Sequence, residues 1–114
     1  MKSETLVVLS MSENQIINII KSVAEKLFPN CKIILFGSRA RKDNLPDSDY
    51  DIMLIIDNKL SPSQKLPLRT KIRKELLKYR IFTDVLIQSK EEVEEKKNLT
   101  GHIVKTILNE GIVI

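Results

Sequence analysis

The longest uninterrupted apolar run in the chain, Ile52–Ile56, most limits the folds that are open to it. A helix that crosses a membrane needs about 18 apolar residues or more, so this run is far too short to form one. It suits a strand buried in the core of a globular domain. The first residues, Met1–Glu4, carry an acidic side chain before any apolar stretch, unlike a secretory signal peptide. We therefore expect neither a membrane span nor export.

The chain of 114 residues has the size of one domain, and we expect a single domain over residues 1–114. It contains one cysteine, Cys31, and one histidine, His102, which excludes an internal disulfide and a structural zinc site of the usual kind. The lone cysteine favours a cytoplasmic location. A formal net charge of +4 permits anionic ligands such as nucleotides or RNA, but a charge of this size also serves solubility alone.

Helical and strand patterns alternate along the chain and predict an α/β (α+β) domain with helices packed on a sheet. Ser12 and Gln15 match a capping box, and apolar residues at helical spacing follow as far as Phe28. A possible short helix and a loop lie within 37–48, and Leu6–Leu9 is ambiguous between strand and helix. The expected strands are Lys32–Phe36, Asp49–Ile56 and Phe82–Ile87, and the chain has a brief extended end at Ile112–Ile114. The first two expected helices are Ser12–Phe28 and Ser63–Tyr79. A further helix begins with the capping box of Ser89 and Glu92, and the last one is capped by Thr100 and ended by Gly111.

Gly37 and Ser38 follow the first of these strands and precede the possible short helix. A glycine at this place lets the backbone approach an anion, and free N–H groups at the start of a helix favour phosphate. The Ser38 hydroxyl adds another donor. A glycine–serine pair after a strand is also a common turn, so the pair alone does not indicate a site.

Asp49 and Asp51 lie at the start of an otherwise apolar strand. The two-residue period of a strand places both carboxylates on one face, while Tyr50 and Ile52 point to the other. Two like charges side by side repel unless a cation lies between them, and Mg²⁺ binds to one or two carboxylates together with substrate phosphates. The alternative is that Ser48 and Asp49 only end a loop.

Asp84 interrupts the β-prone run Phe82–Ile87. If this strand lies beside the strand of Asp49 and Asp51, the three carboxylates form a triad. A triad can hold two metal ions about 3.5–4 Å apart, as in sites that catalyse in-line displacement at phosphorus. The alternative is a polar residue that faces solvent.

These features occur together in one known family. Phe36–Arg41, which reads Phe-Gly-Ser-Arg-Ala-Arg, and Ser48–Ile52, which reads Ser-Asp-Tyr-Asp-Ile, resemble the GS-x10-DxD signature of the polymerase-β-like nucleotidyltransferases. The resemblance is to their minimal nucleotidyltransferase (MNT) branch in particular. A leading helix, Asp84 in the third strand and the ending Ile107–Ile114 also suit that branch. The family often has glycine where this chain has Lys42.

The resemblance implies a polymerase-β-like nucleotidyltransferase fold, with a small mixed sheet and helices on one side of it. It implies transfer of a nucleoside monophosphate, AMP from ATP, to an acceptor hydroxyl, with a two-metal Mg²⁺ site. Asp49, Asp51 and Asp84 would be the catalytic carboxylates and metal ligands, and Asp84 would alternatively help to activate the attacking hydroxyl. The phosphates of the nucleotide would contact Gly37, Ser38, Arg39 and Arg41, although both arginines also suit a solvated surface.

The MNT branch is similar to the antitoxins of HEPN–MNT toxin–antitoxin pairs, in which the nucleotidyltransferase adenylylates its HEPN partner. The resemblance therefore implies a helical HEPN-type toxin as the partner and acceptor. The basic segment Lys65–Arg80 suits either a solvated face or contact with an acidic partner. The alternatives are a non-catalytic antitoxin that neutralises its partner by contact, and a nucleotidyltransferase that acts on RNA or a small molecule. Direct binding to nucleic acid is not expected.

Overall fold

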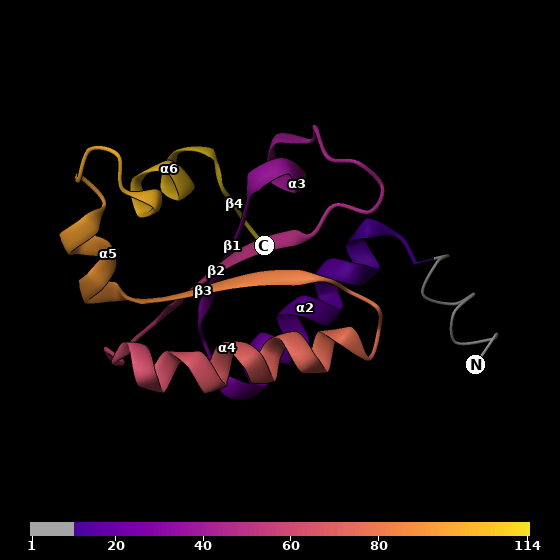
Figure 1. The fold of residues 1–114 in the computed structure, drawn as a ribbon, viewed down its shortest axis with the longest axis horizontal. Coiled ribbons are helices and arrows are strands. Elements are labelled where there is room, and N and C mark those ends of the chain that lie inside the picture. Colours follow the sequence, from indigo (N-terminus) through magenta and orange to yellow (C-terminus); the bar gives the residue numbers. More distant parts are fainter. Residues whose placement is uncertain (1–10) are drawn as a thin grey trace.

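The computed structural model describes residues 11–114, and the ambiguous segment Leu6–Leu9 lies outside them. Within this part of the chain, helices and strands alternate as far as β3, and the helices α5 and α6 then follow each other before a last short strand (Figure 1). The elements in chain order are α2 (Glu13–Leu27), β1 (Lys32–Phe36), α3 (Gly37–Arg41), β2 (Tyr50–Ile56), α4 (Pro62–Leu77), β3 (Thr83–Ser89), α5 (Lys90–Lys96), α6 (Ile103–Glu110) and β4 (Ile112–Val113).

The strands form one mixed sheet in the order β3-β2-β1-β4. β2 pairs antiparallel with β1 and parallel with β3, while β4 pairs antiparallel with β1. A parallel pair needs a long crossover, and α4 supplies it, running alongside β3 (Figure 1). The prediction of a small mixed sheet with helices packed on it is confirmed.

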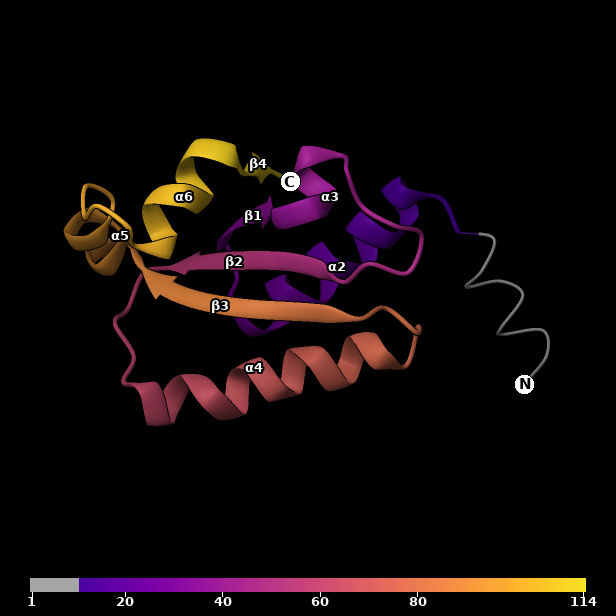
Figure 2. The ribbon, with the colours of Figure 1, turned by 45° about the horizontal axis from the view of Figure 1, so that its top comes forward.

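Helices cover both faces of the sheet, so the prediction that they lie on one side is wrong. α2 and α4 pack on one face, and α5 and α6 pack on the other; Figure 2 shows α4 and α6 on opposite sides of β2. The reason lies in the apolar run of β2. Ile52, Leu54 and Ile56 belong to the core under α2 and α4, whereas Met53 and Ile55 belong to the core under α6. A strand with apolar residues on both faces needs a cover on each.

Helix starts follow local capping chemistry, which the sequence predicted in part. The capping boxes at Ser12 and Ser89 are both present. A third capping box, at Ser61, precedes α4, and the helix begins at Pro62, one residue before the expected start at Ser63. The last helix is capped by His102, not by Thr100, because the His102 Nδ1 accepts the backbone N–H of Val104 at 3.1 Å.

Charged side chains join α4 to α5. The Lys65 ammonium lies 2.8 Å from a carboxylate oxygen of Glu92, and only 13% and 8% of the two side chains are exposed. Glu92 also accepts the backbone N–H of Ser89 at 2.9 Å and lies near Lys96. These partners hold the pKa of Glu92 at about 2, although burial acts in the opposite direction.

None of the helices in residues 11–114 combines the length and the apolar composition that a bilayer span requires.

Candidate active site

The two parts of the GS-x10-DxD motif and the strand of Asp84 meet at one edge of the sheet. β1 ends there, and β2 and β3 begin there, because β1 runs antiparallel to β2 while β3 runs parallel to it. The strand register places Phe36 opposite Asp51 and Asp51 opposite Asp84. The turn after Phe36 therefore brings Gly37 to the same edge as the two carboxylates.

The charges of Asp49 and Asp84 both act on the carboxylate of Asp51. Asp51 is half-buried, while Asp49 and Asp84 are exposed. Burial raises the pKa of Asp51 above its usual value, and the charges of Asp84 and Asp49 raise it further, in that order. Arg41 acts in the opposite direction and lowers this pKa. Among the described residues, Arg41 is thus the one cation found to offset the negative charge around Asp51.

Gly37 is a position at which no side chain fits. Its φ of +70° lies in the left-handed region, which L-residues with a Cβ rarely adopt. A Cβ built on Gly37 would also overlap the Asp51 carboxylate oxygen Oδ2. The glycine therefore lets the backbone after β1 pass directly against the Asp51 carboxylate.

The short helix α3 keeps Ser38 next to this backbone. Ser38 is half-buried, and its carbonyl accepts the backbone N–H groups of Lys42 and Asp43. Lys42 ends the helix at φ +64° and ψ +27°, the left-handed conformation that glycine favours. The turn therefore adopts a backbone suited to glycine, although this chain has lysine there.

Arg39 holds the loop that leads to Asp49. Its guanidinium donates to the Ser48 carbonyl at 2.8 and 3.2 Å and to the Pro46 carbonyl at 3.1 Å. It also lies over the Tyr50 ring, 4.3 Å from the ring centroid. The guanidinium of Arg39 therefore contacts the loop and Tyr50, and no contact between it and Asp49, Asp51 or Asp84 is found within residues 11–114.

Arg41 lies at the acidic edge, together with Glu110, which is not part of the motif. The Arg41 guanidinium bonds to Asp43 through Nε at 3.1 Å and to Glu110 through Nη1 at 3.3 Å. The same Glu110 oxygen accepts the backbone N–H of Gly37 at 3.3 Å. The available signal in the sequence was that Glu110 is the only acidic residue of the last helix and directly precedes a glycine.

The residues of this edge suit a hard divalent cation. Within residues 11–114, no three His, Cys, Asp or Glu side chains are close enough together to hold a metal ion as they stand. The donor set at the edge consists of carboxylate oxygens, which Mg²⁺ prefers, and their mutual repulsion raises the pKa of Asp51. A bound cation would relieve that repulsion, so the chemistry of the edge fits the metal.

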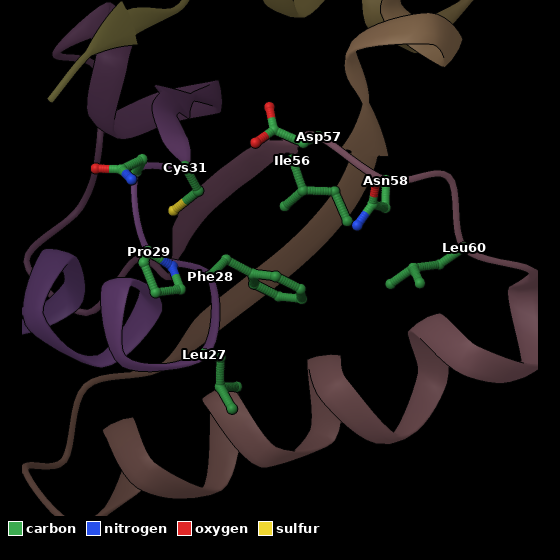
Figure 3. A pocket seen from close by; sticks show the side chains of 9 residues that line it. Leu27, Phe28, Pro29, Cys31, Ile56, Asp57, Asn58 and Leu60 are labelled. Carbon is green, nitrogen blue, oxygen red and sulfur yellow. The ribbon is translucent and has the colours of Figure 1, made fainter.

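Two pockets lie at opposite ends of β2, one close to the carboxylates and one far from them. One, with a volume of about 420 Å³, adjoins the loop before Asp49 and is lined in part by Arg39, Tyr50 and Phe82. The other, of about 220 Å³, lies at the opposite end of β2, where Ile56 and Asp57 line it together with Cys31 (Figure 3). Burial raises the pKa of the Cys31 thiol, which makes it a poor nucleophile.

Comparison with known proteins agrees with the motif. The sequence model of the nucleotidyltransferase domain family matches residues 16–114. A protein of Methanocaldococcus jannaschii, named "putative protein adenylyltransferase", is 37% identical over 83 residues, which cover 73% of this chain and 76% of that protein. A crystal structure described as a toxin–antitoxin with AMP-PNP shares the fold, with a TM-score of 0.60 and 18% identity over 84% of this chain and 69% of that chain.

The family match spans most of the chain, including both parts of the GS-x10-DxD motif. The sheet topology places those parts at one edge. This chain belongs to the nucleotidyltransferase domain family, and it is of the MNT type.

Proposed function

We propose that the chain transfers AMP from ATP to a hydroxyl group of a partner protein. The observation that carries the proposal is the register that sets Asp51 between Asp84 and the turn at Gly37. Carboxylates for a metal and backbone donors for phosphate are both needed to neutralise and position a nucleotide. The name of the M. jannaschii relative supports protein as the acceptor.

Each residue of the edge has a role in this reaction. Asp49, Asp51 and Asp84 would hold Mg²⁺, and Mg²⁺ would neutralise the phosphates and polarise the reacting phosphorus. The phosphates would bind to the Gly37 N–H, the Ser38 hydroxyl and Arg41; Arg39 would act indirectly by positioning Asp49 through its loop.

The transfer itself is a single displacement. The acceptor hydroxyl oxygen forms a bond to the α-phosphorus of ATP while the bond from that phosphorus to the bridging oxygen breaks, and pyrophosphate leaves with the electron pair. The hydroxyl proton would pass to a carboxylate, and we propose this role for Asp84, which is exposed near the start of β3. The products are an AMP-modified protein and pyrophosphate.

The partner we propose is a helical HEPN-type toxin, for which the toxin–antitoxin neighbour gives support. The basic side chains of α4 suit an acidic surface on such a partner. Lys65 is not among them, because it is buried against Glu92. The exposed basic surface that remains consists of Lys71, Arg73, Lys74, Lys78 and Arg80.

The test is co-expression with a HEPN-type protein, chosen from a neighbouring open reading frame where one encodes it, followed by intact mass spectrometry. A mass increase of one AMP on the partner is expected with the wild-type chain. It should be absent with Asp49→Asn/Asp51→Asn and present with Asp57→Asn, the same chemical change at the other end of β2, where Asp57 pairs with Lys90.

The outcomes separate the alternatives. A stable complex that carries no AMP under any condition would establish a binding antitoxin. If radiolabelled ATP instead marks RNA or a small molecule, nucleotidyl transfer stands and the protein acceptor is wrong.

A further inference from the structure

Glu110 lies where the nucleotide phosphates are proposed to bind. Its Oε1 accepts from the Gly37 N–H and from the Arg41 Nη1, each at 3.3 Å. These donors come from a turn more than 60 residues away in the sequence, so the contact depends on tertiary structure. One carboxylate oxygen thus occupies two of the donors that a phosphate oxygen would use.

The backbone around Glu110 fixes this contact. β4 pairs with β1 directly after Glu110, through Leu35 with Ile112 and Ile34 with Val113. Gly111 lets the chain pass close to β1, since a Cβ there would overlap the Ile34 side chain. The end of α6 is therefore held against the end of β1, next to Gly37.

The Glu110 side chain itself is free to leave. About 27% of it is exposed, and within residues 11–114 it contacts the Gly37 N–H and Arg41 and no other polar partner. Arg41 would stay oriented after such a movement, because it bonds to Asp43 through a different nitrogen, Nε. The two donors can therefore pass from the carboxylate to another anion without a change in the backbone.

The negative charge of Glu110 should weaken the binding of ATP. A carboxylate at this place repels a triphosphate and competes with it for the same donors. We propose that Glu110 occupies the phosphate donors of the nucleotide-free protein and that ATP must displace it to bind. This inference rests on the proposed function, and it assigns Glu110 as the residue that sets nucleotide affinity.

The closing experiment is calorimetric titration of the chain with ATP in the presence of Mg²⁺. Glu110→Gln keeps the size of the side chain but removes its charge, and it should lower the Kd for ATP about three- to fivefold, the effect of one exposed ion pair. Glu94→Gln is the matched control, because it removes the same charge from an exposed side chain of α5 whose ion-pair partner is Lys97. Its Kd should equal that of the wild type.

A second measurement follows the contact directly. Hydrogen exchange of the Gly37 amide should be faster in Glu110→Ala than in the wild type without nucleotide, and equal in both proteins when ATP is saturating. A circular dichroism melt confirms that each variant is folded.

The results distinguish two failures. An unchanged or higher Kd in Glu110→Gln would overturn the displacement, even if the protein transfers AMP. If the Kd falls as expected but no AMP is transferred to any acceptor, the displacement stands and the proposed function fails.

Discussion

Asp51 and Asp84 lie directly opposite each other on neighbouring parallel strands. Side chains that are paired in this way share one face of the sheet, so the two carboxylates face the same solvent. The charge of Asp84 raises the pKa of Asp51, which burial has already raised. The repulsion between the two carboxylates therefore lowers the free energy of unfolding of the metal-free protein, relative to a strand pair without this charge repulsion.

Asp51→Asn should raise the melting temperature of the metal-free protein at about pH 7, while it abolishes AMP transfer. An acid whose pKa is raised by folding binds more protons in the folded state, so its contribution to stability falls as the pH rises above the usual aspartate value. The gain should shrink toward zero at about pH 3, where Asp51 is protonated in both states. Asp57→Asn, at the exposed end of β2, should show no such gain; an equal gain there would contradict this account.

The variants Gly37→Ala and Gly101→Ala distinguish backbone strain from a steric clash with the Asp51 carboxylate. Both glycines have positive φ, +70° and +79°, so each substitution should cost about 1–2 kcal/mol of stability. Only the Gly37 methyl meets the Asp51 carboxylate, because nothing lies within 4 Å of a Cβ at Gly101. Denaturant melts should therefore show a loss in both variants, and transfer assays should show a loss of activity in Gly37→Ala alone. Full activity in Gly37→Ala would contradict the site.

Arg39→Lys should reduce the rate of transfer more than it changes the affinity for ATP. Lysine cannot reproduce the forked donors that Arg39 directs at the Ser48 and Pro46 carbonyls, nor its stacking over Tyr50. The loop before Asp49 should then lose its position. Steady-state kinetics would show a lower kcat with a nearly unchanged KM for ATP, whereas Arg69→Lys, in α4 and outside the proposed partner surface, would leave both unchanged. A large rise in KM alone would mean that Arg39 contacts the phosphates after all.

Glu92→Gln should destabilise the fold by about 1.5–3 kcal/mol, the range for hydrogen bonds to charged groups. The pKa of Glu92 falls from 4.5 to about 2 on folding. An acid with a lowered pKa stabilises the fold above its usual value, so this stability is present above about pH 4.5 and is lost as the pH falls toward 2.

Glu94→Gln provides the comparison for Glu92→Gln, because its carboxylate is exposed on the same helix. Its effect should stay within about 0.5 kcal/mol, and urea melts between neutral and acid pH would measure both variants. A pH-independent difference between Glu92→Gln and the wild type would be inconsistent with the assigned ion pair.

The sequence predicts much of this fold because local signals dominate it. The three long strands are apolar runs bounded by polar residues, and the Ser12 and Ser89 capping boxes are local chemistry. The two-sided cover was also readable in principle, since Ile52–Ile56 has no polar residue on either face. The resemblance to the nucleotidyltransferases instead led us to expect helices on one side of the sheet.

Other features depend on partners far along the chain, which no local pattern reports. Glu110 reaches Gly37 only because β4 pairs with β1. Arg39 and Arg41 stand two residues apart in one motif, yet one turns to the loop before Asp49 and the other to Glu110. Lys65 looks like part of a basic face in the sequence, but its partner Glu92 belongs to another helix.

The crossover through α4 also has a consequence for the order of folding events. Strands β1 and β2 pair across a shorter stretch of chain than β2 and β3, and longer loops cost more entropy to close. We therefore expect Asp51 and Asp84 to meet late during folding, and we expect their repulsion to slow the docking of β3. Mg²⁺ should speed refolding of the wild type but not of Asp51→Asn in stopped-flow experiments; equal acceleration of both would show that the acidic edge forms early.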